Sequence, residues 1–133
     1  MLFKESIRTT ERNQFLNIMP LVSTIVKKSG AKDGLVNVFC PHTTAAITIN
    51  ENADPDVTDD LRRKLVSLIP QNESYDHSEG NSDAHVKASL IGASETVILD
   101  HGELVLGTWQ SLYFCEFDGP RARTLYVKIM ASQ

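Results

Sequence analysis

The stretch Glu-Gly-Asn-Ser-Asp-Ala-His-Val-Lys-Ala-Ser-Leu-Ile-Gly, residues 79–92, joins a turn, a helix start and a histidine. Ser82 is a favourable N-cap, and Gly92 suits the left-handed residue that closes many helices. The stretch therefore predicts a short helix over residues 83–91, with polar, turn-forming chain in front of it.

The spacing within this helix predicts which side faces the core. Val86 and Leu90 are four residues apart and form the expected inward face. His85 falls in the first turn, where the partial positive charge of a helix N-terminus disfavours an imidazolium ion. We therefore expect a neutral ring that can bind a metal ion or act as a base.

Outward from this helix, runs of apolar and alternating residues predict strands on both sides. The predicted strands cover residues 2–9, 15–18, 35–40, 45–50, 95–99, 103–106, 111–117 and 124–131. Two further helices are expected, one from Pro20 to Gly30 and one from the Asp54-Pro55 cap to Pro70. Residues 15–18 are expected to form a hairpin with residues 2–9. Because strands and helices do not alternate regularly, the pattern indicates one α+β domain over residues 1–133.

Composition narrows the class of partner and the compartment. The chain has 133 residues, 41% of them hydrophobic and 23% charged, with a formal net charge of -4. These values are typical of a globular domain and give no reason to expect nucleic acid binding. No apolar run is long enough for a membrane span and no signal-peptide pattern is present, so we expect no membrane contact and a cytoplasmic protein. Cys40 and Cys115 lie in apolar runs and are expected to be buried free thiols.

Three of the four histidines are candidates for chemistry. His42 lies at a strand junction, His77 in a long polar loop and His85 in the predicted helix, whereas His101 is expected at an exposed hairpin tip. Imidazoles and carboxylates are the usual ligands of zinc and related divalent ions. The carboxylates that accompany these histidines are Glu51, Asp54 and Glu79. The alternative is that each histidine is an ordinary surface or hydrogen-bonded residue.

A second pattern predicts an anion site. Asn81, Ser82 and the first-turn amides of the helix could bind an anion, with positive charge from Lys87, Arg121 and Arg123. Ordinary helix capping and surface charge explain the same residues equally well.

The segment Gly107-Thr108-Trp109-Gln110 places the single tryptophan beside a glutamine. Trp109 could stack on a flat ring while Gln110 and Glu116 present polar groups to it. The alternative is a tryptophan that belongs to the core.

Together, these residues resemble the YjbQ-like family, whose members are also called secondary thiamine-phosphate synthases. The resemblance runs through most of the chain, and no single motif carries it. The matching segments are residues 42–52 with Asp54-Pro55, residues 79–81 with 84–89, and residues 107–110 with 116–117.

The resemblance implies a β-sandwich-like subunit with mostly antiparallel strands and about three helices, assembled as a homotrimer. It also implies a weak thiamine-phosphate synthase activity, which joins a pyrimidine diphosphate to a thiazole phosphate and is secondary to another role. His42, His85 and Glu51 are then the expected catalytic residues. A divalent ion, zinc or magnesium, would be held by His42, His77 and His85. The expected substrate-binding residues are Asn81, Ser82, Lys87, Trp109, Gln110 and Arg123.

Three functions remain open at this point. The first is a metal-assisted enzyme that acts on a small phosphorylated or heterocyclic metabolite. The second is a non-catalytic binding protein for a metal ion or an anionic metabolite, which the absence of a recognisable nucleophile motif favours. The third is a structural trimer whose polar residues only satisfy one another at an interface.

Overall fold

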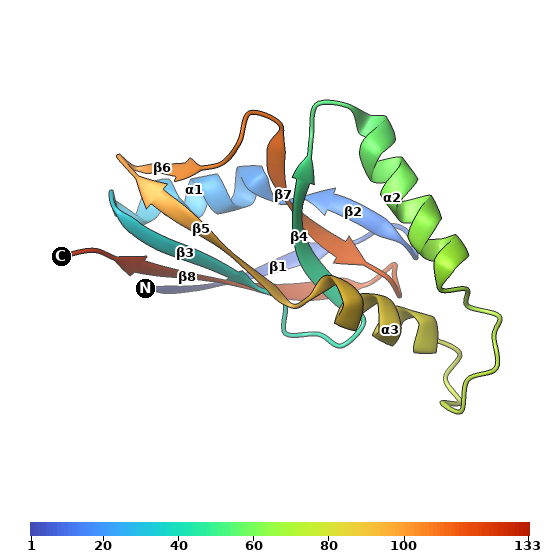
Figure 1. Ribbon diagram of the computed structural model, residues 1–133. Helices are drawn as coiled ribbons and strands as arrows, with labels where there is room; N and C mark the ends of the chain where they lie inside the picture. Colours follow the sequence, from blue (N-terminus) through green and yellow to red (C-terminus); the bar gives the residue numbers. More distant parts are fainter.

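The computed structural model describes residues 1–133 (Figure 1). The helices and strands follow in the order β1 (Leu2–Arg8), β2 (Gln14–Asn17), α1 (Met19–Ser29), β3 (Gly34–Phe39), β4 (Ala45–Glu51), α2 (Pro55–Leu68), α3 (Ser82–Ile91), β5 (Ser94–Asp100), β6 (Glu103–Val105), β7 (Gln110–Glu116) and β8 (Ala122–Ala131). The sequence thus predicted each element correctly, with bounds within two residues for the strands.

The strands form two antiparallel sheets that pack face to face. The larger sheet has the order β1-β8-β3-β5-β6 and the smaller one has the order β2-β7-β4. Helix α1 lies beside the smaller sheet and covers the rest of the larger sheet's inner face (Figure 1). The expected α+β fold of mostly antiparallel strands with three helices is confirmed.

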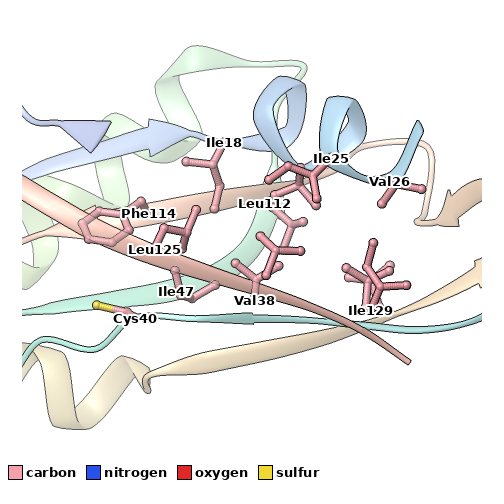
Figure 2. Close-up of a cluster of buried hydrophobic side chains, with 14 of the residues drawn as sticks. Ile18, Ile25, Val26, Val38, Cys40, Ile47, Leu112, Phe114, Leu125 and Ile129 are labelled. Carbon is pink, nitrogen blue, oxygen red and sulfur yellow. The ribbon is translucent and has the colours of Figure 1, made fainter. Parts of the chain in front are cut away.

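The main core lies between the two sheets. Ile25 and Val26 of α1 point toward the larger sheet, while Phe114 and Leu112 of β7 meet Leu125 of β8 (Figure 2). Strand β4 contributes alternate residues to this core, because successive side chains of a strand point to opposite faces. Cys40 lies in the same core and Cys115 is buried on the other face of the smaller sheet, both as free thiols.

A second, smaller cluster lies on the outer face of the smaller sheet. Ala46 of β4 and Tyr113 of β7 pack there against Ala84 and Ala88 of α3. The prediction that Val86 and Leu90 face inward is wrong, since they are 46% and 61% exposed. The small alanines let the helix lie close to the sheet. This close packing, and not the greater hydrophobicity of Val86 and Leu90, decides which face of the helix points inward.

The first two strands of the chain, β1 and β2, pair differently from the prediction. Strand β1 pairs with β8, and β2 pairs with β7, so the expected hairpin between residues 2–9 and 15–18 does not form. Local sequence cannot distinguish a hairpin from two strands that separate into different sheets. The chain instead crosses between the sheets at residues 9–13, and this crossing brings Thr9 and Arg12 beside β7 and α3.

None of the helices combines the length and the apolar character that a membrane crossing requires.

Leu112→Ala should lower the free energy of unfolding by about 2–5 kcal/mol, because Leu112 is 0% exposed and its removal leaves a cavity between the sheets. The matched control is Leu68→Ala at the end of α2, where the side chain is 61% exposed and the change should stay within about 0.5 kcal/mol. Urea unfolding at one fixed protein concentration measures both. Equal losses would contradict this placement of the core.

Candidate functional site

A polar cleft lies where the β3–β4 connection, the α2–α3 loop, α3 and the β7–β8 turn meet. Its volume is about 430 Å³, and none of its eleven lining residues is hydrophobic. The lining residues are Pro41, His42, Thr43, Thr44, His77, Glu79, Asn81, His85, Asp118, Arg121 and Arg123. The structure therefore gathers all three candidate histidines at one place.

A second hollow adjoins this cleft across the two histidines nearest the sheet. It has a volume of about 380 Å³ and shares His42, Thr43 and His85 with the polar cleft. Three alanines, Ala45, Ala88 and Ala93, make this second hollow less polar. One side of the wall formed by His42 and His85 is thus entirely polar, and the other is partly apolar.

A buried ion pair forms the floor of the polar cleft. Glu116 at the end of β7 accepts a hydrogen bond from Arg123 Nε at 2.8 Å and a second one from another guanidinium nitrogen. Thr9 Oγ1 donates to the same carboxylate at 2.7 Å, and the amides of Phe117 and Asp118 donate to its other oxygen. The pair joins the two sheets at this end of the molecule.

The hydrogen bonds keep Glu116 ionised in spite of its burial. Burial by itself raises the pKa of this carboxyl, but the hydrogen bonds from Arg123 and Thr9 outweigh it. The pKa of Glu116 therefore lies below its ordinary value of 4.5. Arg123 also donates to Thr44 Oγ1 at 2.9 Å, which ties the start of β4 to the same network.

A second buried ion pair fixes α3 beneath the cleft. Lys87 Nζ lies 3.0 Å from Asp83 Oδ2, and Arg12 binds both oxygens of the same carboxylate at 3.0 and 3.1 Å. Asn13 accepts a further hydrogen bond from Lys87. Burial by itself raises the pKa of Asp83. The hydrogen bonds from Arg12 and Lys87 lower it by more, so the pKa of Asp83 lies below its ordinary value. Asp83 thus remains charged and holds the helix to the β1–β2 connection.

His77 and His85 form an edge-to-face pair at the mouth of the cleft. Their ring centroids are 5.5 Å apart and the ring planes meet at 88°. Glu79 lies near the outer ring, with its Oε2 3.9 Å from His77 Nε2. His77 and Glu79 are both exposed, so this cluster is open to solvent rather than enclosed.

His42 is held differently, against the backbone of β8. The amide N–H of Thr124 donates to His42 Nε2 at 2.9 Å. The pKa of His42 is lowered by burial and by the nearby positive charge of Arg123. His42 is therefore a neutral, fixed side chain in the wall of the cleft.

Asn81 lies at the start of α3 and contacts the β7–β8 turn. Its Nδ2 donates to Asp118 Oδ2 at 2.9 Å, and its Oδ1 is buried without a hydrogen-bond partner. Asp118 also binds Arg121 at 2.8 Å, so the cleft's most exposed arginine is partly neutralised. Ser82 begins the helix, and Asn81 rather than Ser82 occupies the N-cap position.

The residues present do not form a metal site within one chain. No three histidine, cysteine, aspartate or glutamate side chains are placed so that they could hold a metal ion. The Nε2 atom of His42, a predicted ligand, is already hydrogen-bonded to the β8 backbone. Structural and catalytic zinc sites use at least three protein ligands, which this arrangement does not supply.

Three predicted site residues lie at the opposite end of the smaller sheet. Glu51 ends β4 and pairs with Gln110 at the start of β7, and Trp109 precedes Gln110. The length of β4 places them about 20 Å from the cleft, at the end where the chain turns into α2 (Figure 1). Trp109 is 61% exposed and is not a core residue. Within one chain these residues cannot act together with His42 and His85.

Two predicted cations have structural partners instead of open positions. Lys87 is buried against Asp83 and does not line the cleft, so it is not available to bind a phosphate. Arg123 lines the cleft, but Glu116 neutralises it. The suggestion that Glu116 lies beside a flat ring near Trp109 is wrong, because the two residues lie at opposite ends of β7.

Sequence reasoning missed Asp118 and the partner of Glu116. A glutamate inside the apolar run of residues 112–117 is the available signal, since a buried carboxylate needs a cation. That signal does not identify Arg123, which comes from β8 of the other sheet.

The fold and the cleft define a class of small α+β protein. Its members have two antiparallel sheets and an all-polar cleft with histidines at one end. The family model described as UPF0047 protein YjbQ-like matches residues 4–132. The chain is 50% identical over 133 residues to a UPF0047 protein of Methanocaldococcus jannaschii, covering 100% of this chain and 96% of that protein. It is also 50% identical over 131 residues to YugU of Bacillus subtilis, covering 98% and 99%.

Solved structures agree with these matches. A YjbQ/UPF0047 protein of Clostridium acetobutylicum superposes with a TM-score of 0.94 at 54% identity, covering 96% of this chain and 99% of that one. A YjbQ-like protein of unknown function from Sulfolobus solfataricus gives a TM-score of 0.94 at 32% identity, covering 99% and 97%. The chain belongs to the YjbQ-like UPF0047 family.

Glu116→Gln should lower the free energy of unfolding by about 3–5 kcal/mol, because it leaves Arg123 buried without a counter-charge. The double variant Glu116→Gln/Arg123→Met should recover part of this loss, since neither charge then remains buried. Urea unfolding at pH 7 measures the wild type, the single variants Glu116→Gln and Arg123→Met, and the double variant. A double variant that loses as much as both single changes together would show that the pair is not coupled.

Glu116 should also make the free energy of unfolding depend on pH in the acid range. Because the folded pKa of Glu116 lies below its ordinary 4.5, its contribution is complete above that pH and is lost as the pH falls toward the folded value. The Glu116→Gln protein should lack this part of the acid destabilisation when unfolding is compared between pH 7 and pH 3.

Proposed function

We propose that this protein binds a small phosphorylated metabolite in the polar cleft and acts on it as a transferase. The reaction class that we propose is thiamine-phosphate synthesis, as a weak activity beside another physiological reaction. The observation that carries the proposal is the cleft itself, which unites three histidines and no hydrophobic residue in about 430 Å³.

The size and polarity of the cleft favour a small, highly charged ligand. Pockets for small molecules usually measure some hundreds of cubic ångströms and are largely apolar. An all-polar lining of imidazole, amide, hydroxyl and guanidinium groups supplies hydrogen-bond donors for phosphate oxygens instead. The adjoining hollow, with its three alanines, suits the less polar ring of the same or a second substrate.

The chemistry of the proposed transfer requires no nucleophile from the protein. The carbon–oxygen bond to the diphosphate breaks, pyrophosphate leaves with the electron pair, and the thiazole nitrogen forms the new carbon–nitrogen bond. That nitrogen carries no proton, so no general base is needed either. The contribution of the chain is to position the reactants and to stabilise charge on the departing pyrophosphate with N–H donors. His77 and His85 are the donors nearest the mouth of the cleft.

A divalent ion enters this proposal with the substrate and not as a resident cofactor. Magnesium binds through one or two carboxylates and substrate phosphates and keeps several waters. Glu79 and Asp118 both line the polar cleft. This donor set fits a magnesium–diphosphate complex better than a resident zinc ion.

The second candidate function is a binding protein for an anionic metabolite, without catalysis. The placement of Trp109 and Gln110 away from the cleft favours it, because one chain then offers no aromatic platform for a pyrimidine ring. Saturable ligand binding without any product would support this function over the transferase.

We also propose that the protein assembles as a homotrimer. The outer face of the larger sheet is uncovered, and Met130, Leu35, Ile98 and Val105 lie side by side across β8, β3, β5 and β6. All four side chains are exposed. A row of apolar residues on an uncovered sheet face is typical of a contact between subunits.

His77→Asn and His85→Asn should each weaken binding of the diphosphate substrate about tenfold or more, because a hydrogen bond to a charged group is lost. Isothermal titration with inorganic pyrophosphate and magnesium measures the affinity, and product formation measures synthase turnover. The matched control is His101→Asn at the exposed β5–β6 turn, where asparagine tolerates the positive φ of 51°.

The control should leave affinity and turnover unchanged. If the three variants bind pyrophosphate as the wild type does, the cleft is not the phosphate site. If the His77→Asn and His85→Asn variants lose pyrophosphate binding but the wild type itself forms no product, the binding-protein function is favoured over the transferase.

Ile98→Glu should dissociate the assembly, because it places a charge in the centre of the apolar row, where Ile98 is 56% exposed in one chain. Sedimentation or light scattering gives the mass. The matched control is Leu68→Glu, at an exposed apolar position on α2. A mass of one chain for the wild type, or an unchanged mass for Ile98→Glu, would contradict this interface.

A further inference from the structure

Strand β8 extends beyond its partner at the floor of the cleft. Strand β3 pairs with β8 only as far as Phe39, which lies opposite Tyr126. Thr124, two residues earlier in β8, therefore meets no β3 residue on that side. The His42 ring takes this place, and both the N–H and the carbonyl of Thr124 lie within 3.2 Å of its Nε2 atom.

This contact decides which ring nitrogen carries the proton. The amide hydrogen of Thr124 is fixed by the peptide plane and points at Nε2, with a nitrogen–nitrogen distance of 2.9 Å. A hydrogen on Nε2 could reach the Thr124 carbonyl at 3.2 Å only by crowding this amide hydrogen, so the shorter 2.9 Å contact assigns Nε2 as the acceptor. A neutral imidazole has one donor and one acceptor nitrogen, which places the proton on Nδ1.

The Nδ1–H group is available to a ligand. The structure gives it no hydrogen-bond partner, and Asn81 Oδ1 is the sole buried side-chain nitrogen or oxygen atom without a partner. His42 lines both the polar cleft and the adjoining hollow. Its free N–H thus lies in the wall between the two spaces.

We infer that His42 is a neutral N–H donor to a phosphate oxygen of the ligand, held in this form by the Thr124 amide, and is not a metal ligand. This inference rests on the proposed phosphate site and assigns His42 a role distinct from that of His77 and His85. A neutral donor in the wall supplies a directed hydrogen bond without adding a charge next to the buried Arg123.

The backbone contact also explains why metal binding at His42 is disfavoured. A metal ion at Nε2 would have to displace the Thr124 amide, which would then lose its acceptor at the edge of β8. A metal ion at Nδ1 would require that proton to move to Nε2, where it would displace the 2.9 Å contact with the Thr124 amide and could be accepted only by the Thr124 carbonyl at 3.2 Å. Both routes give up the Thr124 amide contact, a cost that binding at His77 or His85 does not carry, because no backbone group contacts their ring nitrogens.

Nitrogen-15 NMR of the full-length protein with labelled histidine tests the inference without a variant. Long-range proton–nitrogen correlations should show a protonated Nδ1 and an unprotonated Nε2 for His42, assigned by the signal that disappears in His42→Asn. Adding inorganic pyrophosphate should shift the Nδ1 signal. Adding zinc chloride should move signals of His77 or His85 and leave those of His42 unchanged.

The outcomes separate this inference from the proposed function. A His42 ring protonated on Nε2, or a zinc-dependent change at its Nε2, would overturn the inference. Pyrophosphate shifts at His77 and His85 with none at His42 would also overturn it and leave the phosphate site in place. No shift at any of the three histidines would overturn both.

A pair of substitutions tests the donor role by affinity. His42→Leu removes the N–H and should weaken pyrophosphate binding roughly tenfold or more. His42→Asn keeps an N–H close to the position of Nδ1 and should lose less. Equal losses in the two variants, both folded by circular dichroism, would show that His42 only supports the wall.

Discussion

The buried ion pair between Glu116 and Arg123 is the contact on which the candidate site depends. It joins β7 of the smaller sheet to β8 of the larger one, and through Thr44 it also fixes the start of β4. A carboxylate removed from water must be fully hydrogen-bonded, and five donors surround this one. The cleft therefore stands on a rigid polar floor at the point where the two sheets meet.

The buried carboxylates give the two nearby cations a structural role. Arg123 and Lys87 are the cations that a phosphate site would be expected to use, yet each is neutralised by a buried carboxylate. They position the β7–β8 turn and α3, which carry Asp118 and His85. The groups left for a ligand are mainly neutral donors. The anion that we propose would be bound there by directed hydrogen bonds, in a field weaker than that of a cluster of free cations.

The three histidines of the cleft differ in what holds them in place. His42 is fixed by the backbone of β8, whereas His77 and His85 contact each other at the open mouth of the cleft. The first is a rigid part of the wall, and the other two can adjust to a ligand or to an ion that arrives with it. An apolar row on the uncovered sheet face and the exposed Trp109 lie elsewhere on the molecule, so the proposed assembly and the proposed ligand site use separate surfaces of one chain.

The sequence by itself determined the elements of this protein, because alternation, caps and turn residues are local signals. Asp54 and Pro55 at the start of α2 and Gly30 at the end of α1 are examples. It also selected the three histidines that meet in the cleft. Only the tertiary structure decided the partners: β1 with β8, Glu116 with Arg123, Asp83 with Lys87, and Glu51 and Trp109 at the far end of the sheet. Asp83 and Lys87 are only four residues apart, and Glu116 and Arg123 only seven, but the burial that makes these charges pair depends, like the pairing of β1 with β8, on the packing of the whole chain.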